Sequence, residues 1–163
     1  MAIQSIYLAG GCFWGTQKFF DQFPGVVGTQ VGYANGPTAN PSYQEVCASS
    51  GHAETVRIDF DEEKISLRQL LDYYFIVIDP MAYHRQGPDM GIQYRTGIYY
   101  SDPALLPALR ERCDEEQQKY SRPMETELLP LANFYPAEEY HQKYLEKNPE
   151  GYCHIPDKYM HLV

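Results

Sequence analysis

The sequence predicts an α+β protein of two layers, with a ferredoxin-like βαββαβ core followed by an extra helix, an extra strand and an irregular C-terminal tail. Short strand-like segments alternate, in that order, with segments whose apolar residues have helical spacing. No Ser/Gly-rich linker or internal repeat divides the chain, so we expect one domain over residues 1–163, with the tail starting near residue 146. We further expect an antiparallel sheet with its helices on one face.

Local signals place the elements in order. Gly10-Gly11 ends the first strand, and Pro24-Gly25 stops the helix that begins at Cys12. Ser66 and Gln69 form a capping box, which predicts the start of the second helix. The elements expected are strands at 6–9, 26–33, 56–60, 96–100 and 125–131, helices at 12–23, 67–75, from Pro103 or Pro107 to about 120, and 138–145, and irregular stretches at 34–50 and 79–94.

Composition argues against several classes of protein. The net charge of −9 repels phosphate backbones, so no nucleic-acid partner is expected. No run of 18 apolar residues occurs, and residues 1–5 lack the basic start of a signal peptide. We therefore expect no membrane partner and a cytoplasmic protein, which we take to be a monomer. The 15 tyrosines are unusual, and their hydroxyls are available to line a polar pocket.

The four cysteines, at positions 12, 47, 113 and 153, are too widely spaced for a paired CxxC zinc motif. Without a secretion signal, a disulfide framework is not expected, which leaves thiols in a reducing compartment. Cys47, between apolar neighbours, and Cys113, on an apolar helix stripe, are interpreted as structural. Cys153 lies in the irregular tail, where it is either an incidental exposed thiol or one that moves towards another sulfur.

Cys12 lies where a thiol is readily activated, between a glycine pair and the start of a helix. Unpaired N–H groups and the positive end of the helix dipole stabilise a thiolate there, so we expect the pKa of Cys12 to be lowered. Phe13 and Trp14 are neighbours on this helix and cannot both be buried on one face, so one is expected to face a pocket. The alternative is a buried Cys with both aromatics in the core.

Three other segments carry groups suited to proton transfer or hydrogen bonding. Glu54, at the mouth of a strand, is a candidate general acid if partial burial keeps it protonated; otherwise it is a solvated loop carboxylate. Asp89 can accept peptide N–H groups. Tyr43 and Tyr94 can donate to an oxygen, although each alone also suits the edge of a core. His52 with Cys47 lacks further metal ligands, so we expect no metal.

Gly11-Cys12-Phe13-Trp14-Gly15 resembles the catalytic signature of the peptide methionine sulfoxide reductase A family. Further segments match the family in its order. They are 40–47 with Tyr43, Gly51-His52-Ala53-Glu54, 85–87, Asp89 with Gly91 and Gln93-Tyr94-Arg95, Phe134 through Tyr140-His141-Gln142 to Asn148-Pro149, and Gly151-Tyr152-Cys153. The similarity spans about residue 5 to residue 153. It departs in a loop before Gly51 that is about one residue short, and in the absence of a further tail cysteine after Cys153.

The resemblance implies that methionine-S-sulfoxide, free or in proteins and peptides, is reduced to methionine, an antioxidant repair reaction. Cys12 is implied as the nucleophile. Glu54, assisted by Tyr43 and Tyr94, is implied to stabilise and protonate the sulfoxide oxygen. No metal or organic cofactor is implied.

The resemblance also implies substrate contacts and a recycling route. Phe13 and Trp14 hold the substrate methyl group, and Asp89 holds a substrate backbone N–H. Cys12 becomes a sulfenic acid, which Cys153 converts to a Cys12–Cys153 disulfide, and thioredoxin reduces that disulfide.

Two other classes of function stay open from the residues alone. A thiol peroxidase also uses an activated Cys and a resolving Cys, but needs neither an aromatic methyl pocket nor a proton-donating Glu. A non-catalytic zinc module built from Cys and His would instead bind metal stoichiometrically.

Overall fold

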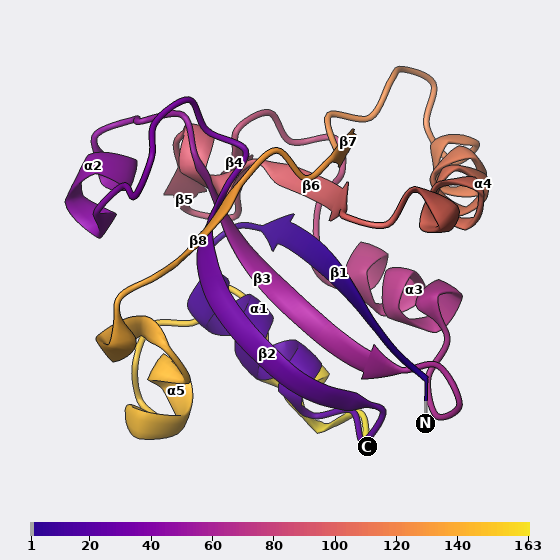
Figure 1. Cartoon of the computed structure of the whole chain (residues 1–163), viewed down its shortest axis with the longest axis horizontal. Helices are drawn as coiled ribbons and strands as arrows, with labels where there is room; N and C mark the ends of the chain where they lie inside the picture. Colours follow the sequence, from indigo (N-terminus) through magenta and orange to yellow (C-terminus); the bar gives the residue numbers. More distant parts are fainter. Residues whose placement is uncertain (1) are drawn as a thin grey trace.

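The computed structural model describes residues 2–163 and is built on one six-stranded sheet (Figure 1). The strands are β1 Ile3–Gly10, β2 Val26–Ala34, β3 Ala53–Asp61, β6 Thr96–Tyr100, β7 Glu127–Pro130 and β8 Phe134–Pro136, and the separate hairpin consists of β4 Arg85–Gln86 and β5 Asp89–Met90. The order in the large sheet is β7-β6-β1-β3-β2-β8. All of its neighbouring strands are antiparallel except β6 and β7, which are parallel. The expectation of an antiparallel sheet is therefore wrong at β7, and the sheet is mixed.

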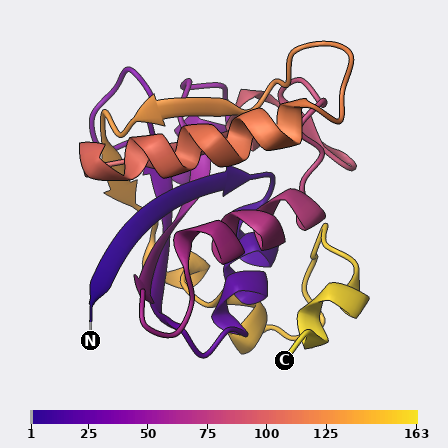
Figure 2. The ribbon, with the colours of Figure 1, turned by 90° about the vertical axis from the view of Figure 1, so that its right-hand side faces the viewer.

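The helices lie around the sheet, and most of them contribute to one apolar cluster with it. They are α1 Phe13–Asp21, α2 Tyr43–Cys47, α3 Leu67–Val77, α4 Leu106–Gln117 and α5 Tyr144–Lys147, with 3-10 turns η1 Ile92–Tyr94, η2 Pro103–Leu105, η3 Glu139–His141 and η4 Asp157–His161. α1 contacts β1, β2 and β3, and α3 packs against α4 (Figure 2). Among residues 2–163, no helix has the length and apolar character needed to cross a membrane.

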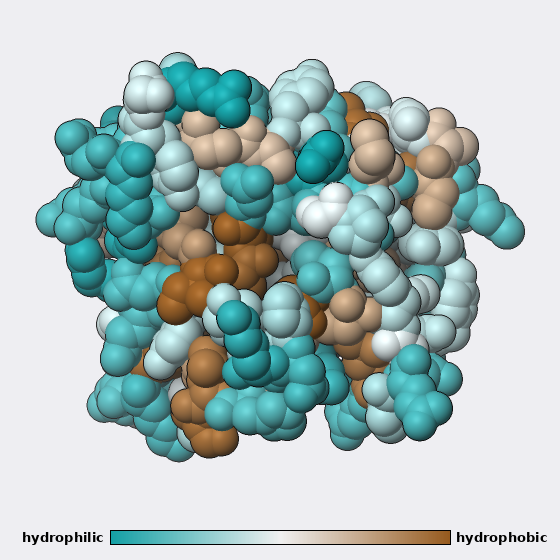
Figure 3. All heavy atoms as spheres, turned by 180° about the vertical axis from the view of Figure 1, so that it is seen from behind, coloured by the Kyte–Doolittle hydropathy of each residue, from teal (hydrophilic) through white to brown (hydrophobic). Residues whose placement is uncertain are grey.

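The alternation in β1 separates two faces of the sheet. Ile6 and Leu8 are fully buried in the cluster that contains the core residues of α1, α3 and α4. Tyr7 and Ala9 point to the other face and join a smaller cluster against which Phe134 packs. The back of the molecule shows apolar side chains in several groups, the most extended near the centre, between hydrophilic ones (Figure 3).

Several local predictions are confirmed residue by residue. The strand expected at 96–100 is β6. The Ser66 hydroxyl accepts the N–H of Gln69 at 3.0 Å, and the Gln69 side chain accepts the N–H of Ser66 at 2.9 Å, which completes the capping box of α3. Both candidate prolines lie in early turns, Pro103 in η2 and Pro107 at the second position of α4, where a missing N–H costs little.

Three expected segments differ from the structure. The helix expected at 138–145 is broken into η3 and α5, because Lys143 has a left-handed φ of 54° and the Gln142 side chain bonds the backbone of Val31. The loop expected at 34–50 contains α2, which begins at a capping box of Ser42 and Glu45. The irregular stretch at 79–94 contains the β4–β5 hairpin and η1.

Candidate active site

Strand register brings three segments that are far apart in the sequence together at one end of the central strands. Ala9 pairs with Thr55 and Gly10 pairs with Thr96, so the end of β1 lies beside the beginnings of β3 and β6. Cys12 follows β1, Glu54 is the second residue of β3, and Tyr94 ends the turn just before β6. Three side chains far apart in sequence therefore meet around the start of α1.

Cys12 occupies the N-cap of α1 and is 6% exposed. The Cys12 side chain makes no capping hydrogen bond, but the nearby N–H groups of Trp14 and Gly15 lower the pKa of the thiol, as the helix start predicts. Burial is the larger effect, and together with the nearby carboxyl of Glu54 it raises the pKa of Cys12 well above its ordinary value. The expectation of a lowered pKa is therefore wrong for the resting protein, which holds Cys12 as a neutral thiol.

Glu54 lies next to this thiol and is 1% exposed. Its Oε1 accepts the backbone N–H of Phe13 at 3.2 Å, while Oε2 is buried without a hydrogen-bond partner in residues 2–163. Burial raises the pKa of Glu54 to about 8; the Phe13 N–H lowers it somewhat, and Asp89 raises it. At neutral pH the carboxyl is mostly protonated and able to donate.

Tyr43 and Tyr94 are both half-buried beside this carboxyl. Burial, and after it the proximity of Glu54, raises the pKa of each phenol, so both hydroxyls are neutral donors at physiological pH. The start of α2 is held in place because the Tyr43 N–H donates to Oε2 of Glu138 at 3.0 Å. The structure therefore groups the two tyrosines with Cys12 and Glu54.

The aromatic pair divides as the helix geometry predicts. Phe13 is fully buried, with its ring 5.7 Å from that of Tyr33. Trp14 is partly exposed, stacks on Tyr144 at 3.8 Å, and donates from Nε1 to Nδ1 of His141 at 2.9 Å. Trp14 also borders a hollow of about 280 Å³ between α1 and α5, which none of the other candidate site residues lines.

Asp89, in β5, is half-buried at the same site. Its Oδ2 is buried with no hydrogen-bond partner in the described part of the chain, although the side chain also bonds Tyr152. Asp89 raises the pKa values of Cys12, Glu54 and Tyr94, which places its charge close to all three. A buried acceptor without a partner suits a ligand N–H.

The tail brings Cys153 to the first turn of α1. Its Sγ donates to the carbonyl oxygen of Ile155 at 3.4 Å, and a Cβ added at Gly15 would lie 3.0 Å from that sulfur. The four cysteines are free thiols. Cys113 packs at the edge of the core as expected, whereas Cys47 is exposed. The interpretation of Cys47 as a packed structural residue is wrong, because α2 turns this position outwards although Val46 beside it is buried.

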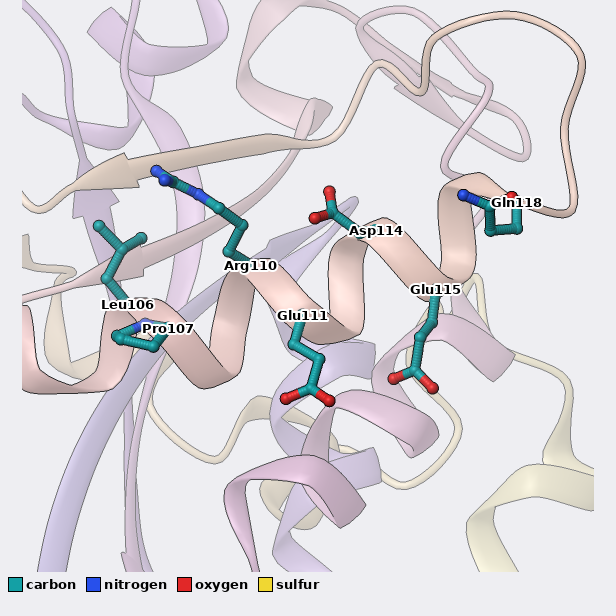
Figure 4. Close-up of a pocket in the computed structure, with 7 residues that line it drawn as sticks. All are labelled: Leu106, Pro107, Arg110, Glu111, Asp114, Glu115 and Gln118. Atoms are coloured by element: carbon teal, nitrogen blue, oxygen red, sulfur yellow. The ribbon is translucent and has the colours of Figure 1, made fainter.

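Both ring nitrogens of His52 contact the loop before β3. Its Nε2 lies 2.8 Å from the carbonyl oxygen of Thr38, and its Nδ1 lies 3.0 Å from the Ser50 hydroxyl. In residues 2–163, no group of three or more His, Cys, Asp or Glu side chains is placed to hold a metal ion. A second hollow, of about 640 Å³, lies along α4 and is separate from the candidate site. Seven residues of the α4 segment line it, and none of them is a candidate site residue (Figure 4).

Three neighbours of the site were not assigned a role from the sequence. His141 is fully buried and contacts Trp14, Tyr144 stacks on the same indole, and His154 lies against Gly11 and Gly15. His141 and Tyr144 both fall in the matched segment from Phe134 to Pro149, which is the signal that could have found them. Composition and periodicity carry no information about such contacts, which join residues more than 120 positions apart.

Comparison with known proteins identifies a family. A model of the family described as peptide methionine sulfoxide reductase matches residues 4–161. The chain is 55% identical over 155 residues to a peptide methionine sulfoxide reductase of Clostridium acetobutylicum, covering 94% of this chain and 96% of that protein. It superposes on the reduced form of Mxr1 from Saccharomyces cerevisiae with a TM-score of 0.87 at 40% identity, covering 93% of this chain and 88% of the other.

The same yeast protein is also known in a second state. Mxr1 in complex with Trx2 matches with a TM-score of 0.61 at 28% identity, covering 87% of this chain and 84% of the other.

Proposed function

The chain belongs to the peptide methionine sulfoxide reductase family, and from this premise we propose that it reduces methionine-S-sulfoxide, free or in peptides and proteins, to methionine. The reaction is thiol-dependent and repairs oxidised methionine. The observation that carries the proposal is the buried pairing of a thiol with a protonated carboxyl. Glu54 is 1% exposed, and its Oε1 accepts the N–H of the residue that follows Cys12.

In the first step Cys12 attacks the sulfur of the sulfoxide, and its thiol proton passes to Glu54 as Glu54 gives its own proton to the oxygen, so the carboxyl ends the step protonated. Negative charge grows on the sulfoxide oxygen, where the proton of Glu54 and the hydroxyls of Tyr43 and Tyr94 stabilise it. The oxygen passes to Cys12, which becomes a sulfenic acid, and methionine leaves. The thiol sulfur loses the two electrons that the sulfoxide sulfur gains. The raised pKa of Glu54 supports the role of acid, because the proton is present at neutral pH.

Substrate recognition uses the aromatic wall and Asp89. We assign the methyl group of the sulfoxide to the wall formed by Phe13 and Trp14, in which Trp14 is the exposed face and the fully buried Phe13 supports it from the core, and Asp89 accepts a backbone N–H of the substrate. Trp14 is partly exposed, and its indole is held by His141 at Nε1 and by Tyr144 on the ring face. This supports its role in holding the methyl group. The unpaired Oδ2 of Asp89 supports its role in accepting a substrate N–H. A wall that accepts methyl but not oxygen distinguishes the two sulfoxide epimers by shape.

Recycling uses the tail and an external reductant. Cys153 attacks the sulfenic acid, water leaves, and the Cys12–Cys153 disulfide is reduced by thioredoxin through thiol–disulfide exchange. The contact of Cys153 with the first turn of α1 supports this pairing, and the complex of yeast Mxr1 with Trx2 supports thioredoxin as the partner.

The enzyme assay follows NADPH consumption with thioredoxin, thioredoxin reductase and the two resolved sulfoxide epimers. The S epimer is consumed and the R epimer is not, so a racemic mixture stops at about half conversion. A protein that turns over hydrogen peroxide but neither epimer is a thiol peroxidase instead. Stoichiometric zinc in a native mass spectrum, without turnover, supports the binding-module alternative.

Three broader features belong to the same proposal. The strand order β6-β1-β3-β2, connected through α1 and α3, supports a ferredoxin-like core. One main apolar cluster supports a single domain over residues 1–163, with its tail from about residue 146; residue 1 lies outside the described part. A thioredoxin-recycled enzyme suits the reducing cytoplasm, where we expect a monomer.

A further inference from the structure

We propose that His154 is the base that accepts the proton of Cys153 when this thiol attacks the sulfenic acid on Cys12. The inference rests on the proposed function, since it concerns the second half of that reaction. His154 directly follows Cys153 in the tail, and its ring packs over the start of α1.

The hydrogen bonds of His154 define which ring nitrogen is basic. Nε2 lies 2.9 Å from the carbonyl oxygen of Gly10. A carbonyl oxygen can only accept, so Nε2 carries the hydrogen and Nδ1 of the neutral ring holds a lone pair. Nδ1 is buried and has no hydrogen-bond partner in residues 2–163. A buried basic nitrogen without a partner is costly, and it is free to receive a proton.

Gly15 brings this nitrogen and the thiol to one place. A Cβ added at Gly15 would lie 3.0 Å from Sγ of Cys153 and 3.1 Å from Nδ1 of His154. Both atoms therefore face the same small space above the first turn of α1. Gly15 is the third residue of α1, and its N–H is close enough to the sulfur of Cys12 at the N-cap to lower the pKa of that thiol, so this space adjoins both sulfurs that form the disulfide.

Cys153 needs such a base. Its pKa is raised by burial, and its thiol donates at 3.4 Å to the carbonyl oxygen of Ile155. A thiol attacks as the thiolate, so the proton must be transferred as the new bond forms. A carbonyl oxygen cannot take that proton at neutral pH, whereas an imidazole can.

The step is balanced in atoms and electrons. The S–S bond forms between Cys153 and Cys12 as the S–O bond of the sulfenic acid breaks; the sulfur of Cys153 is oxidised and the sulfenic sulfur of Cys12 is reduced. The thiol proton moves to Nδ1 of His154 and from there to the departing hydroxyl, which leaves as water. While His154 is charged, the Gly10 carbonyl and the negative charge of Asp89 stabilise it.

The groups around Cys153 and His154 keep His154 unprotonated before the step. Burial lowers the pKa of His154, and Asp89 of β5 and the Gly10 carbonyl oppose the shift without cancelling it. Lys18 of α1 lowers the pKa of Cys153, whereas Asp157 of the tail raises it. His154 is therefore mainly neutral at neutral pH, with Nδ1 available.

The test separates the two halves of the reaction in a single turnover. Reduced enzyme is mixed with one equivalent of a peptide that contains methionine-S-sulfoxide, without reductant, and is quenched with an alkylating reagent at successive times. Released methionine and the Cys12–Cys153 disulfide are then quantified. The variants are His154→Gln, which keeps an N–H donor towards Gly10 but no basic nitrogen, and His154→Ala. His161→Gln, an exposed histidine in the same tail, is the matched control.

We expect all of these proteins to release one methionine per enzyme. Disulfide formation slows by about 10²–10⁴-fold in both His154 variants, the range of a lost general base, and imidazole in the buffer partly restores it in His154→Ala. The wild-type rate of disulfide formation rises with pH through a titration that His154→Gln lacks.

Three results would contradict these expectations. Disulfide formation at the wild-type rate in His154→Gln overturns the role of base. Slow formation that keeps the wild-type pH titration and is not rescued by imidazole also overturns it, because His154 then only positions the tail. A wild-type enzyme that releases no methionine overturns the proposed function, and the role of His154 with it.

Discussion

The segment around Cys12 and the segment around Cys153 hold their thiols in opposite ways. Cys12 joins an eight-residue strand to a nine-residue helix, and the Thr16 hydroxyl bonds the carbonyl oxygens of Gly10 and of Cys12 at 3.2 and 3.4 Å. Cys153 lies between α5 and η4 in irregular chain, and its sulfur has one side-chain hydrogen bond, to Ile155 two residues away.

This difference matches the two chemical tasks. Reduction of a sulfoxide needs a nucleophile, an acid and donors held in one geometry, which a strand–helix junction supplies. Disulfide formation instead needs one partner that moves, because the two Cα atoms must come within about 7 Å. If the contrast is correct, changes at the junction abolish all turnover, whereas changes in the tail stop only recycling.

The largest expected effect is that of Cys12→Ser. Activity should be lost with every reductant, because a serine hydroxyl is barely ionised at neutral pH and does not accept oxygen as sulfur does. Methionine release is measured directly with both thioredoxin and a small thiol. Cys113→Ser, at a half-buried thiol outside the site, is the control and should remain active. Near-normal turnover of Cys12→Ser would move the nucleophile elsewhere.

Cys153→Ser tests the tail segment of this comparison. We expect one methionine per enzyme, then no cycling with thioredoxin, because no intramolecular disulfide forms. A small thiol partly restores turnover by reaching the sulfenic acid directly. Cys47→Ser is the stricter control, since Cys47 is also exposed enough to react, and it should cycle normally. Peptide mapping of wild type after one turnover that finds Cys12 joined to Cys47 or Cys113 would sink the assignment.

Glu54→Gln keeps a hydrogen-bond donor but removes the transferable proton. The chemical step should slow by about 10²–10⁴-fold with little change in substrate affinity. Because the pKa of Glu54 is raised to about 8, the acid form is present below that pH, and the wild-type rate of the chemical step should fall as pH rises through it. Glu54→Gln should lack this decline. Glu62→Gln, at an exposed carboxyl, is the control, and a wild-type rate in Glu54→Gln would remove the role of acid.

The smallest effect is expected at His141, which holds Trp14. Burial lowers the pKa of His141, so its neutral ring accepts the indole N–H at Nδ1. His141→Phe keeps an aromatic ring but leaves that N–H unpaired, which costs about 1–3 kcal/mol and should raise KM about tenfold with a smaller change in kcat. Steady-state kinetics of His161→Phe, at an exposed position, provide the comparison. An unchanged KM would show that Trp14 needs no such anchor.

Local information in the sequence predicted most of the elements and the candidate site residues. The capping box at Ser66 and Gln69 and the alternation in 96–100 depend on residues a few positions apart, so they could be predicted without the rest of the chain. A similar box at Ser42 and Glu45 was available and would have predicted α2. The ordered motifs made Cys12, Glu54 and their partners candidates through the family resemblance.

Tertiary structure alone decided the state of those residues. The helix start by itself lowers the pKa of Cys12, but burial and the approach of Glu54, 42 positions away in the sequence, raise it. The break in 138–145 likewise depends on a hydrogen bond from Gln142 to Val31, 111 positions apart. Desolvation and long-range hydrogen bonds depend on which segments pack together, and local sequence patterns do not contain that information.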